Sequence, residues 1–383
     1  MGGLSLAWMQ LIREKRRLVA ALAGISFAVM LMLMQIGFRE ALFTSMTLWH
    51  QNLKGDLVLI NPQYEYLIAS KNFTERRLYQ ALAFDEVESI GSFYTGLAAW
   101  KHPETHRESN IFVMGFDPAA AVFAIPGVDE GVRHLRLPDT ALFDLLARPE
   151  FGPVPQMIGR DGQVVTEVNN RRIEVRGLFQ LGTSFGANAS LITSEQTFLR
   201  LFPWRQRGLV DVGIITLRAG CNVEAARDRL AAVLPGDVEV LTRLQFTAKE
   251  KKFFSDNMPI GFIFNLGMVM GMIVGAVIVY QILYTDVSDH LSEYATLKAM
   301  GHGDRYLFSI VLNEAMILSV LGFLPGFGIS QGLYVLTHRT THLPIVMTLD
   351  RVAFVLTMTV LMCVASGALA VRRLRSADPA EIF

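Results

Sequence analysis

The sequence predicts an integral membrane protein with four transmembrane α-helices, one followed by three, and a large α+β extracytoplasmic domain between helices 1 and 2. Of its 383 residues, 51% are hydrophobic and only 18% are charged. Four apolar stretches reach the roughly 20 residues that a spanning helix needs. They lie at residues 18–38, 260–284, 306–336 and 352–371, and ordinary charged sequence separates the first two.

The composition excludes several classes of protein. Lys and Arg number 35 and so do Asp and Glu, which leaves no net positive charge to hold nucleic acid phosphates. No nucleic acid partner is therefore expected. The two cysteines, Cys221 and Cys363, are too few for a disulfide framework or a cysteine-rich metal site.

The first apolar stretch, residues 18–38, is interpreted as a retained anchor. It is too long for the apolar core of a typical signal peptide, and no small-residue cleavage pattern follows it. In residues 1–17, apolar side chains recur at helical spacing, from Leu4 and Trp8 to Ile12. This pattern predicts a cytoplasmic amphipathic helix in the headgroup layer. The alternative is a plain extension of the first spanning helix.

Basic residues beside the apolar stretches predict the orientation. Arg13, Lys15 and two further arginines precede the first stretch, and Arg372, Arg373 and Arg375 follow the last. Because lysine and arginine collect on the cytoplasmic side, both termini are expected in the cytoplasm. The large domain then lies on the other side of the membrane.

Residues 39–255 are expected to form this α+β domain, in two lobes. Period and composition predict strands at 56–60, 111–116, 210–217 and 238–241, and a hairpin joining 164–168 to 172–179 through Asn169 and Asn170. Helices are expected at 74–83, with Thr74 as the N-cap, and at 223–234, with Asn222 as the N-cap.

Residues 256–284 are assigned to the second spanning helix and its stalk, which Pro259 could kink. This helix carries Gly267, Gly271 and Gly275, spaced by four residues on one face. Such a face lets another helix approach closely, within or between subunits. The alternative is that these glycines only reflect the high glycine content of membrane helices.

Residues 285–305 form a short cytoplasmic loop with a helical pattern of its own. Leu291, Tyr294 and Leu297 recur at helical spacing, and Gly301 is a natural helix end. A surface that exposes Leu291, Tyr294 and Met300 is expected to bind a partner. The alternative is a helix that rests on the bilayer.

The third stretch, residues 306–336, contains Pro325, which should kink it, and Glu314. Glu314 is either a carboxyl group facing protein or water inside the membrane or a residue near the interface. An outer loop at 337–351, the fourth spanning helix at 352–371 and a cytoplasmic tail at 372–383 complete the chain.

Catalytic motifs are sparse. The sequence holds no phosphate-binding loop and no zinc-protease motif, and no cofactor, metal site or catalytic residue is expected. Residues 182–186 match the Gly-x-Ser-x-Gly pattern of a hydrolase nucleophile at Ser184. Because a strand-like segment follows where that motif needs a helix, a turn is the favoured interpretation.

Two segments resemble a known family. Residues 292–301, Ser-Glu-Tyr-Ala-Thr-Leu-Lys-Ala-Met-Gly, resemble the Glu-Ile-Gly-Val-Leu-Arg-Ala-Leu-Gly segment of FtsX/MacB-type permeases. Residues 372–381 resemble the basic end followed by Ala-Asp-Pro in that family, and the layout of helices agrees. Residues 171–194 look most like the DevC-type branch. Tyr294 and Ala295 depart from the usual Ile-Gly, and Lys298 replaces an arginine.

The resemblance implies a non-catalytic permease subunit of an ABC exporter in the bacterial inner membrane, working as a homodimer with its large domain in the periplasm. A separate ABC ATPase would bind the loop through a coupling helix. Its residues would be Asp289, Leu291, Glu293, Tyr294, Leu297, Lys298, Met300 and Gly301. For the DevC-type branch it implies an HlyD-like periplasmic adaptor, an outer-membrane channel and a lipid-like or hydrophobic substrate, beside contacts with membrane lipids.

Three alternatives remain open. The chain could be a lipoprotein-release or cell-division-regulating permease of the same superfamily. It could be a membrane-anchored hydrolase that uses Ser184. It could also be a sensor, although its cytoplasmic segments are too short to hold a signalling domain.

Overall fold

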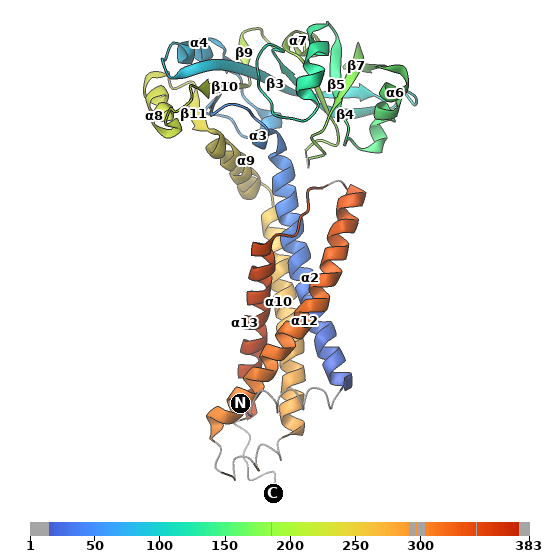
Figure 1. Ribbon diagram of the computed structural model, residues 1–383, viewed down its shortest axis with the longest axis vertical. Coiled ribbons are helices and arrows are strands. Elements are labelled where there is room, and N and C mark those ends of the chain that lie inside the picture. The colour runs from blue at the N-terminus through green and yellow to red at the C-terminus, as the bar shows by residue number, and fades with distance from the viewer. Residues whose placement is uncertain are drawn as a thin grey trace. The chain divides into compact units, whose positions relative to one another are not determined.

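The computed structural model describes residues 15–184, 186–290, 296, 300, 303–341 and 343–374 (Figure 1). The chain divides into two compact units. The helical unit is built from residues up to 41, from 259–341 and from 345 onward, and the sheet domain is built from residues 42–258 and 342–344. The sequence prediction of four spanning helices around an inserted α+β domain is confirmed.

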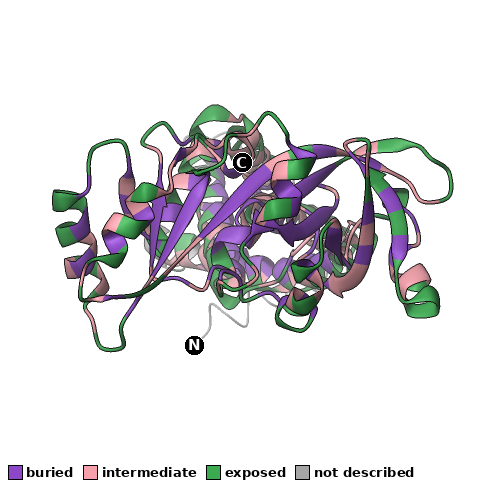
Figure 2. Ribbon diagram, turned by 90° about the horizontal axis from the view of Figure 1, so that it is seen from above, coloured by how far each residue is buried: buried purple, intermediate pink, exposed green. Residues whose placement is uncertain are grey.

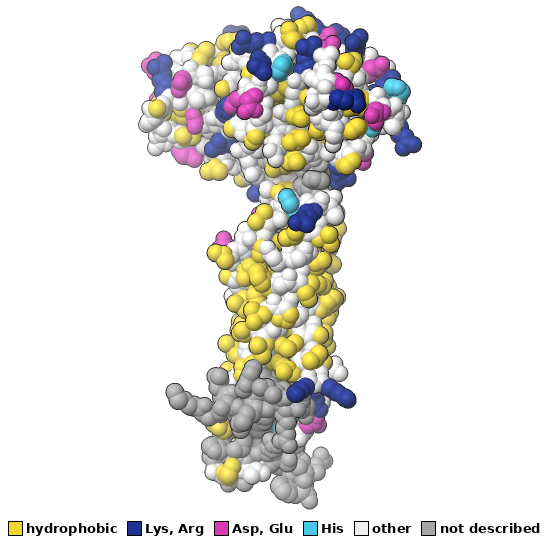
Figure 3. Space-filling view, turned by 45° about the vertical axis from the view of Figure 1, so that its right-hand side comes forward, with side chains coloured by type: hydrophobic (Ala, Val, Ile, Leu, Met, Phe, Trp, Pro, Cys, Tyr) yellow, Lys and Arg dark blue, Asp and Glu magenta, His cyan; other side chains and the backbone are white. Residues whose placement is uncertain are grey.

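The helical unit contains four helices that are long and apolar enough to cross a membrane. They are α2 (Lys15–Met46), α10 (Ile260–Asp289), α12 (Asp304–Thr341) and α13 (Leu349–Leu374). Helix α2 continues without a break into the first residues of the sheet domain, and α12 continues through Pro325. Figure 3 shows many hydrophobic side chains on the visible surface of the described part of this unit.

The sheet domain is organised around nine strands in the order β11-β1-β10-β3-β4-β8-β5-β7-β6. Most neighbours are antiparallel, whereas β4 pairs with β8 and β5 with β7 in parallel. The strands are β1 (Leu57–Ile60), β3 (Val87–Lys101), β4 (Glu108–Phe116), β5 (Thr140–Asp144), β6 (Val164–Val168), β7 (Arg171–Phe179), β8 (Ser190–Ser194), β10 (Val212–Leu217) and β11 (Glu239–Thr242). A separate pair joins β2 (Phe73–Thr74) to β9 (Leu209–Val210).

Both faces of the nine-stranded sheet are buried. Along β1, Leu57 and Leu59 enter one hydrophobic cluster while Val58 and Ile60 enter the other, as the alternation of side chains in a strand requires. Figure 2 shows the strands as mostly buried and the surrounding helices as partly exposed. A close-packed core on each side makes the sheet a stiff support for the helices that pack on its two faces.

Short helices cover the two faces. The first cluster takes side chains from α4 (Arg76–Leu82), α7 (Glu195–Leu201) and α8 (Val223–Val233). The second takes side chains from α3 (Leu48–Gln51) and α9 (Arg243–Asn257). The other short helices of the domain are α5 (Val128–Gly131), α6 (Val154–Asp161) and the 3₁₀ turns η1 (Leu67–Ala69), η2 (Val132–Arg136) and η3 (Pro149–Phe151).

Several local predictions are confirmed and one is wrong. Asn169 and Asn170 both adopt positive φ in the tight turn between β6 and β7, which suits asparagine. Asn222 caps α8 by accepting a hydrogen bond from the Ala225 N–H. Thr74, however, is not an N-cap, because it pairs with Leu209 in β2 and α4 begins only at Arg76. The division into two lobes stays a prediction.

Candidate functional site

The expected coupling segment follows the end of α10. Asp289 is the last residue of that helix and pairs with Arg17 of α2. Met300 is 66% exposed, and its N–H donates to the Thr296 carbonyl oxygen at 3.0 Å, the spacing of one α-helical turn. Leu291, Glu293, Tyr294, Leu297, Lys298 and Gly301 lie outside the described residues.

The three glycines of α10 lie where the helix meets α2. A Cβ atom built on Gly275 would lie 2.6 Å from the Ala28 Cβ and 2.6 Å from the Met362 Sδ of α13. On Gly271 it would lie 3.2 Å from the Leu31 Cβ, and on Gly267 it would lie 2.6 Å from the Gln35 amide. The structure thus places this face against a neighbouring helix of the same chain.

A second glycine face, on α12, was missed in the sequence. A Cβ on Gly326 would lie 2.7 Å from the Ser26 carbonyl oxygen, and one on Gly322 would lie 2.6 Å from the Ile25 Cβ. The Ser26 hydroxyl donates to the Gly322 carbonyl oxygen at 2.9 Å. Helix α2 therefore has small residues against it from both α10 and α12, an arrangement that membrane helices use for close packing.

Inside the sheet domain, a buried polar network joins the segment after α2 to the segment before α10. The Tyr64 hydroxyl donates to Glu250 Oε2 at 2.9 Å, and the Leu67 N–H donates to Glu250 Oε1 at 3.1 Å. The His50 Nε2 lies 3.4 Å from the same Oε2. His50 belongs to α3 and Glu250 to α9, so this His50–Tyr64–Glu250 network ties the two helices together.

Burial strengthens the electrostatic interactions within this network, because the protein interior has a low dielectric constant. Desolvation, followed by the charge of Glu250 and the hydrogen bond to it, raises the pKa of Tyr64 well above its usual value. Among the described residues, the His50 Nδ1 has no hydrogen-bond partner. His50 therefore joins this polar network through its Nε2 atom.

Aromatic rings close around the network. Phe246 lies with its ring centroid 4.4 Å from that of His50 and 5.3 Å from that of Tyr64. Tyr66 stacks on Phe253 of α9 at 4.9 Å. Because these rings exclude water, the charged and polar atoms depend on one another for hydrogen bonds. We call this arrangement the α3–α9 clamp.

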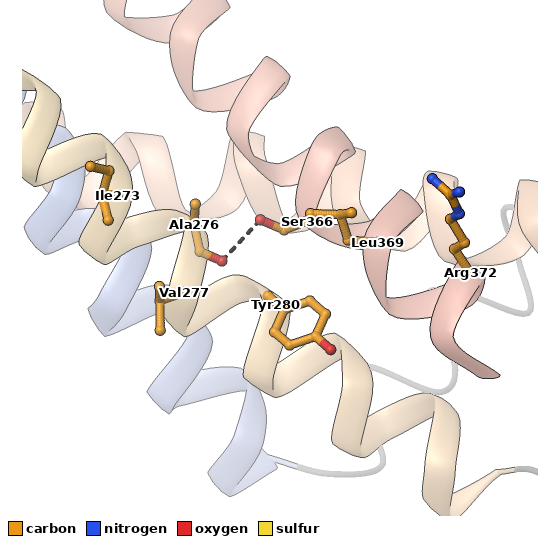
Figure 4. A pocket seen from close by; sticks show the side chains of 7 residues that line it. All are labelled: Ile273, Ala276, Val277, Tyr280, Ser366, Leu369 and Arg372. Atoms are coloured by element: carbon orange, nitrogen blue, oxygen red, sulfur yellow. Dashed lines mark hydrogen bonds between the residues drawn. The ribbon is translucent and has the colours of Figure 1, made fainter. Parts of the chain in front are cut away.

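A groove of about 780 Å³ lies in the helical unit between α10 and α13 (Figure 4). Its walls are mostly apolar, and Tyr280 and Arg372 lie at one end. The Ser366 hydroxyl donates to the Ala276 carbonyl oxygen at 2.9 Å and joins the two helices along the groove. An apolar trough with a cation at its end suits one hydrocarbon chain with an anionic headgroup.

Ser184 lies in a turn between β7 and β8. Its N–H donates to the Ala187 carbonyl oxygen at 2.9 Å, and its Oγ accepts from the Ala187 N–H at 3.1 Å. The strand β8 follows, where a nucleophile elbow needs a helix. The geometry supports the prediction of a turn. Among the described residues, no group of three or more possible metal ligands is found.

We expect Ser184→Ala to leave the protein functionally unchanged. It removes one hydrogen bond in a turn, which costs about 1 kcal/mol or less of unfolding free energy. Hydrolysis of chromogenic esters by the purified wild type and by this variant is the measurement. Equal background rates are expected, and an activity present in the wild type and lost in the variant would restore the hydrolase alternative.

Comparison with known proteins identifies the C-terminal part of the chain. Residues 265–379 match the family model described as FtsX-like permease C-terminal. The search among curated proteins found no match to this chain.

Two solved structures resemble the sheet domain. The periplasmic region of MacB from Actinobacillus actinomycetemcomitans has 10% identity and a TM-score of 0.36, over 51% of this chain and 92% of that one. The extracellular domain of the noncanonical ABC-type transporter YknZ from Gram-positive bacteria has 13% identity and a TM-score of 0.35, over 49% of this chain and 98% of that one. The family match assigns residues 265–379 of the chain to the FtsX-like permease C-terminal family.

Proposed function

We propose that the chain is the membrane subunit of an ABC exporter that transmits the motion of a separate ATPase to its extracytoplasmic domain. Permeases of this family are transport subunits. The proposal adds that this chain serves in an exporter. The observation that carries it is the α3–α9 clamp. A displacement that enters the sheet domain along α2 or along α10 reaches the same buried network.

The path begins at the coupling segment, residues 285–305, where the ATPase would bind. Asp289 ends α10 and pairs with Arg17, so the two helices that lead toward the sheet domain are joined at this end. An exposed ion pair of this kind stabilises by about 1 kcal/mol or less, which lets the two helices part when pushed.

The path continues along α2 and α10. Helix α2 is one continuous helix from Lys15 to Met46, and only the short segment around Met258 and Pro259 separates α9 from α10. Helices are stiff over such lengths, so an axial displacement is carried rather than absorbed. The capping box of Thr242 and Gln245 fixes the N-terminal end of α9 directly after β11.

A homodimer suits the exposure of α10. In the most apolar stretch of α10, only 17% is buried within the chain. The corresponding share in the other three spanning helices is 33% to 50%. The glycine face of α10 is already used against α2, so a second copy would contact the opposite face, which includes the exposed Phe262, Leu266 and Val269. We propose an inner-membrane location with both termini in the cytoplasm, on the basis of the basic residues at the helix ends.

The finer proposal concerns partners and cargo. The resemblance of residues 171–194, which include β7 and β8, to the DevC-type branch supports an HlyD-like adaptor, an outer-membrane channel and a lipid-like substrate. The groove beside Arg372 is suited to a membrane lipid. Purification from native membranes tests this: an ATPase with such an adaptor is expected, and a lipoprotein carrier or a cell-wall hydrolase would favour the alternative permease roles.

The ATPase contact has a sharper test. Replacing Leu291, Tyr294 and Leu297 together with alanine should weaken ATPase binding about tenfold or more, because buried interface side chains carry most of the binding energy. Leu324→Ala is the matched control, since this exposed leucine lies in α12, away from the loop. Pull-down of the ATPase from detergent extracts is the measurement. Equal binding by the triple variant and the control, at equal membrane insertion, would contradict the proposal.

A further inference from the structure

The groove between α10 and α13 has an apolar part and a polar end. Its volume of about 780 Å³ falls within the range of small-molecule sites, about 300–1,000 Å³. Ile273, Val277 and Leu369 line the apolar part, whereas Tyr280 and Arg372 lie at one end (Figure 4). A molecule that fills this groove therefore needs an apolar chain and one polar group.

The direction of the groove follows from its two helices. The hydrogen bond from the Ser366 hydroxyl to the Ala276 carbonyl oxygen brings these two residues to the same level. Tyr280 follows Ala276 and Arg372 follows Ser366, so both helices run toward the polar end. At 1.5 Å per residue, Ile273 and Tyr280 lie about 10 Å apart along α10. The apolar part thus fits within one leaflet of a hydrocarbon core about 30 Å thick.

The polar end has the features of a membrane surface. Arg372 lies close to the end of α13 at Leu374, and an arginine there can place its charge in the headgroup layer. Tyr284 stacks on Tyr280 with ring centroids 5.9 Å apart. Tyrosines gather where a spanning helix meets the headgroups. With the orientation proposed above, this end of the groove faces the cytoplasmic leaflet.

Charge selects the kind of headgroup. Arg372 is exposed and takes part in no ion pair with the other residues that the structure describes. None of the described residues that line the groove is acidic. An anionic phosphate would therefore meet a cation, whereas the ammonium group of a zwitterionic lipid would find no carboxylate. Basic pockets between spanning helices on the cytoplasmic side typically hold anionic headgroups.

A second copy of the chain is the competing occupant. The face of α10 proposed for the homodimer, with Phe262, Leu266 and Val269, precedes the groove residues 273–280, so the two surfaces can be occupied separately. A protein helix seated in the groove would also cover Arg372, and removing a charge from water without a partner is costly. An anionic lipid brings the partner with it.

We propose that the groove between α10 and α13 binds one anionic phospholipid of the surrounding membrane, with an acyl chain along Ile273 and Val277 and its phosphate on Arg372. This inference deepens the part of the proposed function that assigns a membrane lipid to the groove, and it rests on that part alone. Lipid binding can fail while the ATPase contact holds, and the reverse.

The test is native mass spectrometry of the full-length protein in mild detergent, titrated with phosphatidylglycerol or with phosphatidylethanolamine of the same acyl chains. The wild type should bind phosphatidylglycerol at least about fivefold more tightly, the equivalent of about 1 kcal/mol for one cation. Arg372→Gln should remove this preference. Arg16→Gln is the matched control, because it removes the same charge from an exposed residue of α2 that does not line the groove.

A second variant tests the apolar part. Val277 is 56% exposed, so Val277→Trp fills the groove with little change to the packing inside the helical unit. It should lower the affinity for both lipids at least about fivefold. Val320→Trp is the matched control, because this valine of α12 is 49% exposed and lies outside the groove.

Three results would overturn the proposal. Equal affinity of the wild type for the two lipids would leave only non-specific contact with the bilayer, and so would equal effects of Arg372→Gln and Arg16→Gln. A Val277→Trp variant that keeps its lipid and loses its partner copy would assign the groove to the second copy. The same spectra report both properties, because they resolve bound lipids and the number of chains.

Discussion

Glu250→Ala is expected to destabilise the sheet domain by about 3 kcal/mol or more. Glu250 accepts hydrogen bonds from the Tyr64 hydroxyl and the Leu67 N–H, and both donors are buried. Alanine leaves these donors without an acceptor, and each buried unsatisfied group costs about 1–3 kcal/mol. Urea unfolding of the purified full-length protein, followed by tryptophan fluorescence, measures the loss, because Trp49 lies buried in the same cluster.

Glu250→Gln is the control, because it keeps the shape of the side chain and removes its charge. It keeps one acceptor oxygen and nearly the same volume, so a cost of about 1 kcal/mol is expected. Tyr64→Phe removes a single hydrogen bond and should cost a similar amount. If Glu250→Ala unfolded at the same urea concentration as the wild type, the clamp would contribute nothing to stability.

The same variant separates stability from force transmission. The clamp connects α3 to α9, so its loss should increase amide hydrogen exchange in both helices before the rest of the sheet domain. Under the proposed function, ATP hydrolysis by the assembled complex should persist while export is lost. Hydrolysis and export reduced in equal proportion would indicate a general folding defect instead.

The membrane helices could be predicted because their signal is local. An uninterrupted apolar run of the right length is enough to identify a spanning helix. The ends were less well defined: α2 extends to Met46 because residues 39–46, which include Arg39 and Glu40, remain helical. The hairpin at Asn169 and Asn170 was equally local, since turn geometry selects those residues.

Strand β3 illustrates what the sequence concealed. It is the longest strand, yet Gly91 and Gly96 interrupt its alternation of side chains. The space beside each glycine is filled from elsewhere in the fold. A Cβ on Gly96 would lie 2.8 Å from the ring of Phe202, and one on Gly91 would lie 3.1 Å from Val122. A glycine that admits a distant side chain cannot be distinguished from a turn glycine without the structure.

The candidate sites depend on contacts that no local pattern encodes. The Tyr64 hydroxyl and the Glu250 carboxylate are 186 residues apart in the chain. His50 and Glu250 come from helices that only the fold brings together. Glu314 attracted notice in the sequence as a carboxyl group inside an apolar stretch, and the packing of the helical unit leaves it only 2% exposed.

The glycine faces follow the same logic. Side chains of α2 fill the gaps left by the glycines of α10 and α12: the Ala28 Cβ lies 2.6 Å from a Cβ built on Gly275, and the Ile25 Cβ lies 2.6 Å from one built on Gly322. Small residues let two helices approach this closely, so that van der Waals packing holds them together. The sequence contains the glycines, but only the packing identifies the helix that they face.

We therefore expect Gly326→Ala to be the most damaging small substitution in the helical unit, at about 1–3 kcal/mol of unfolding free energy. The added Cβ would lie 2.7 Å from the Ser26 carbonyl oxygen and 3.0 Å from the Ser26 Cα. These are backbone atoms, so no rotamer change relieves the clash and α2 must shift away from α12. The midpoint of thermal unfolding in detergent is the measurement.

Gly328→Ala, two residues further along the same helix, is the matched control. Nothing lies within 4 Å of a Cβ built there, so alanine should be neutral or stabilise the helix by up to about 1 kcal/mol. The two variants have the same composition and helix propensity and differ only in what the methyl group meets. Equal unfolding midpoints would mean that α2 and α12 are not in backbone contact at Gly326, and the close packing of the α12 glycines on α2 would have to be abandoned.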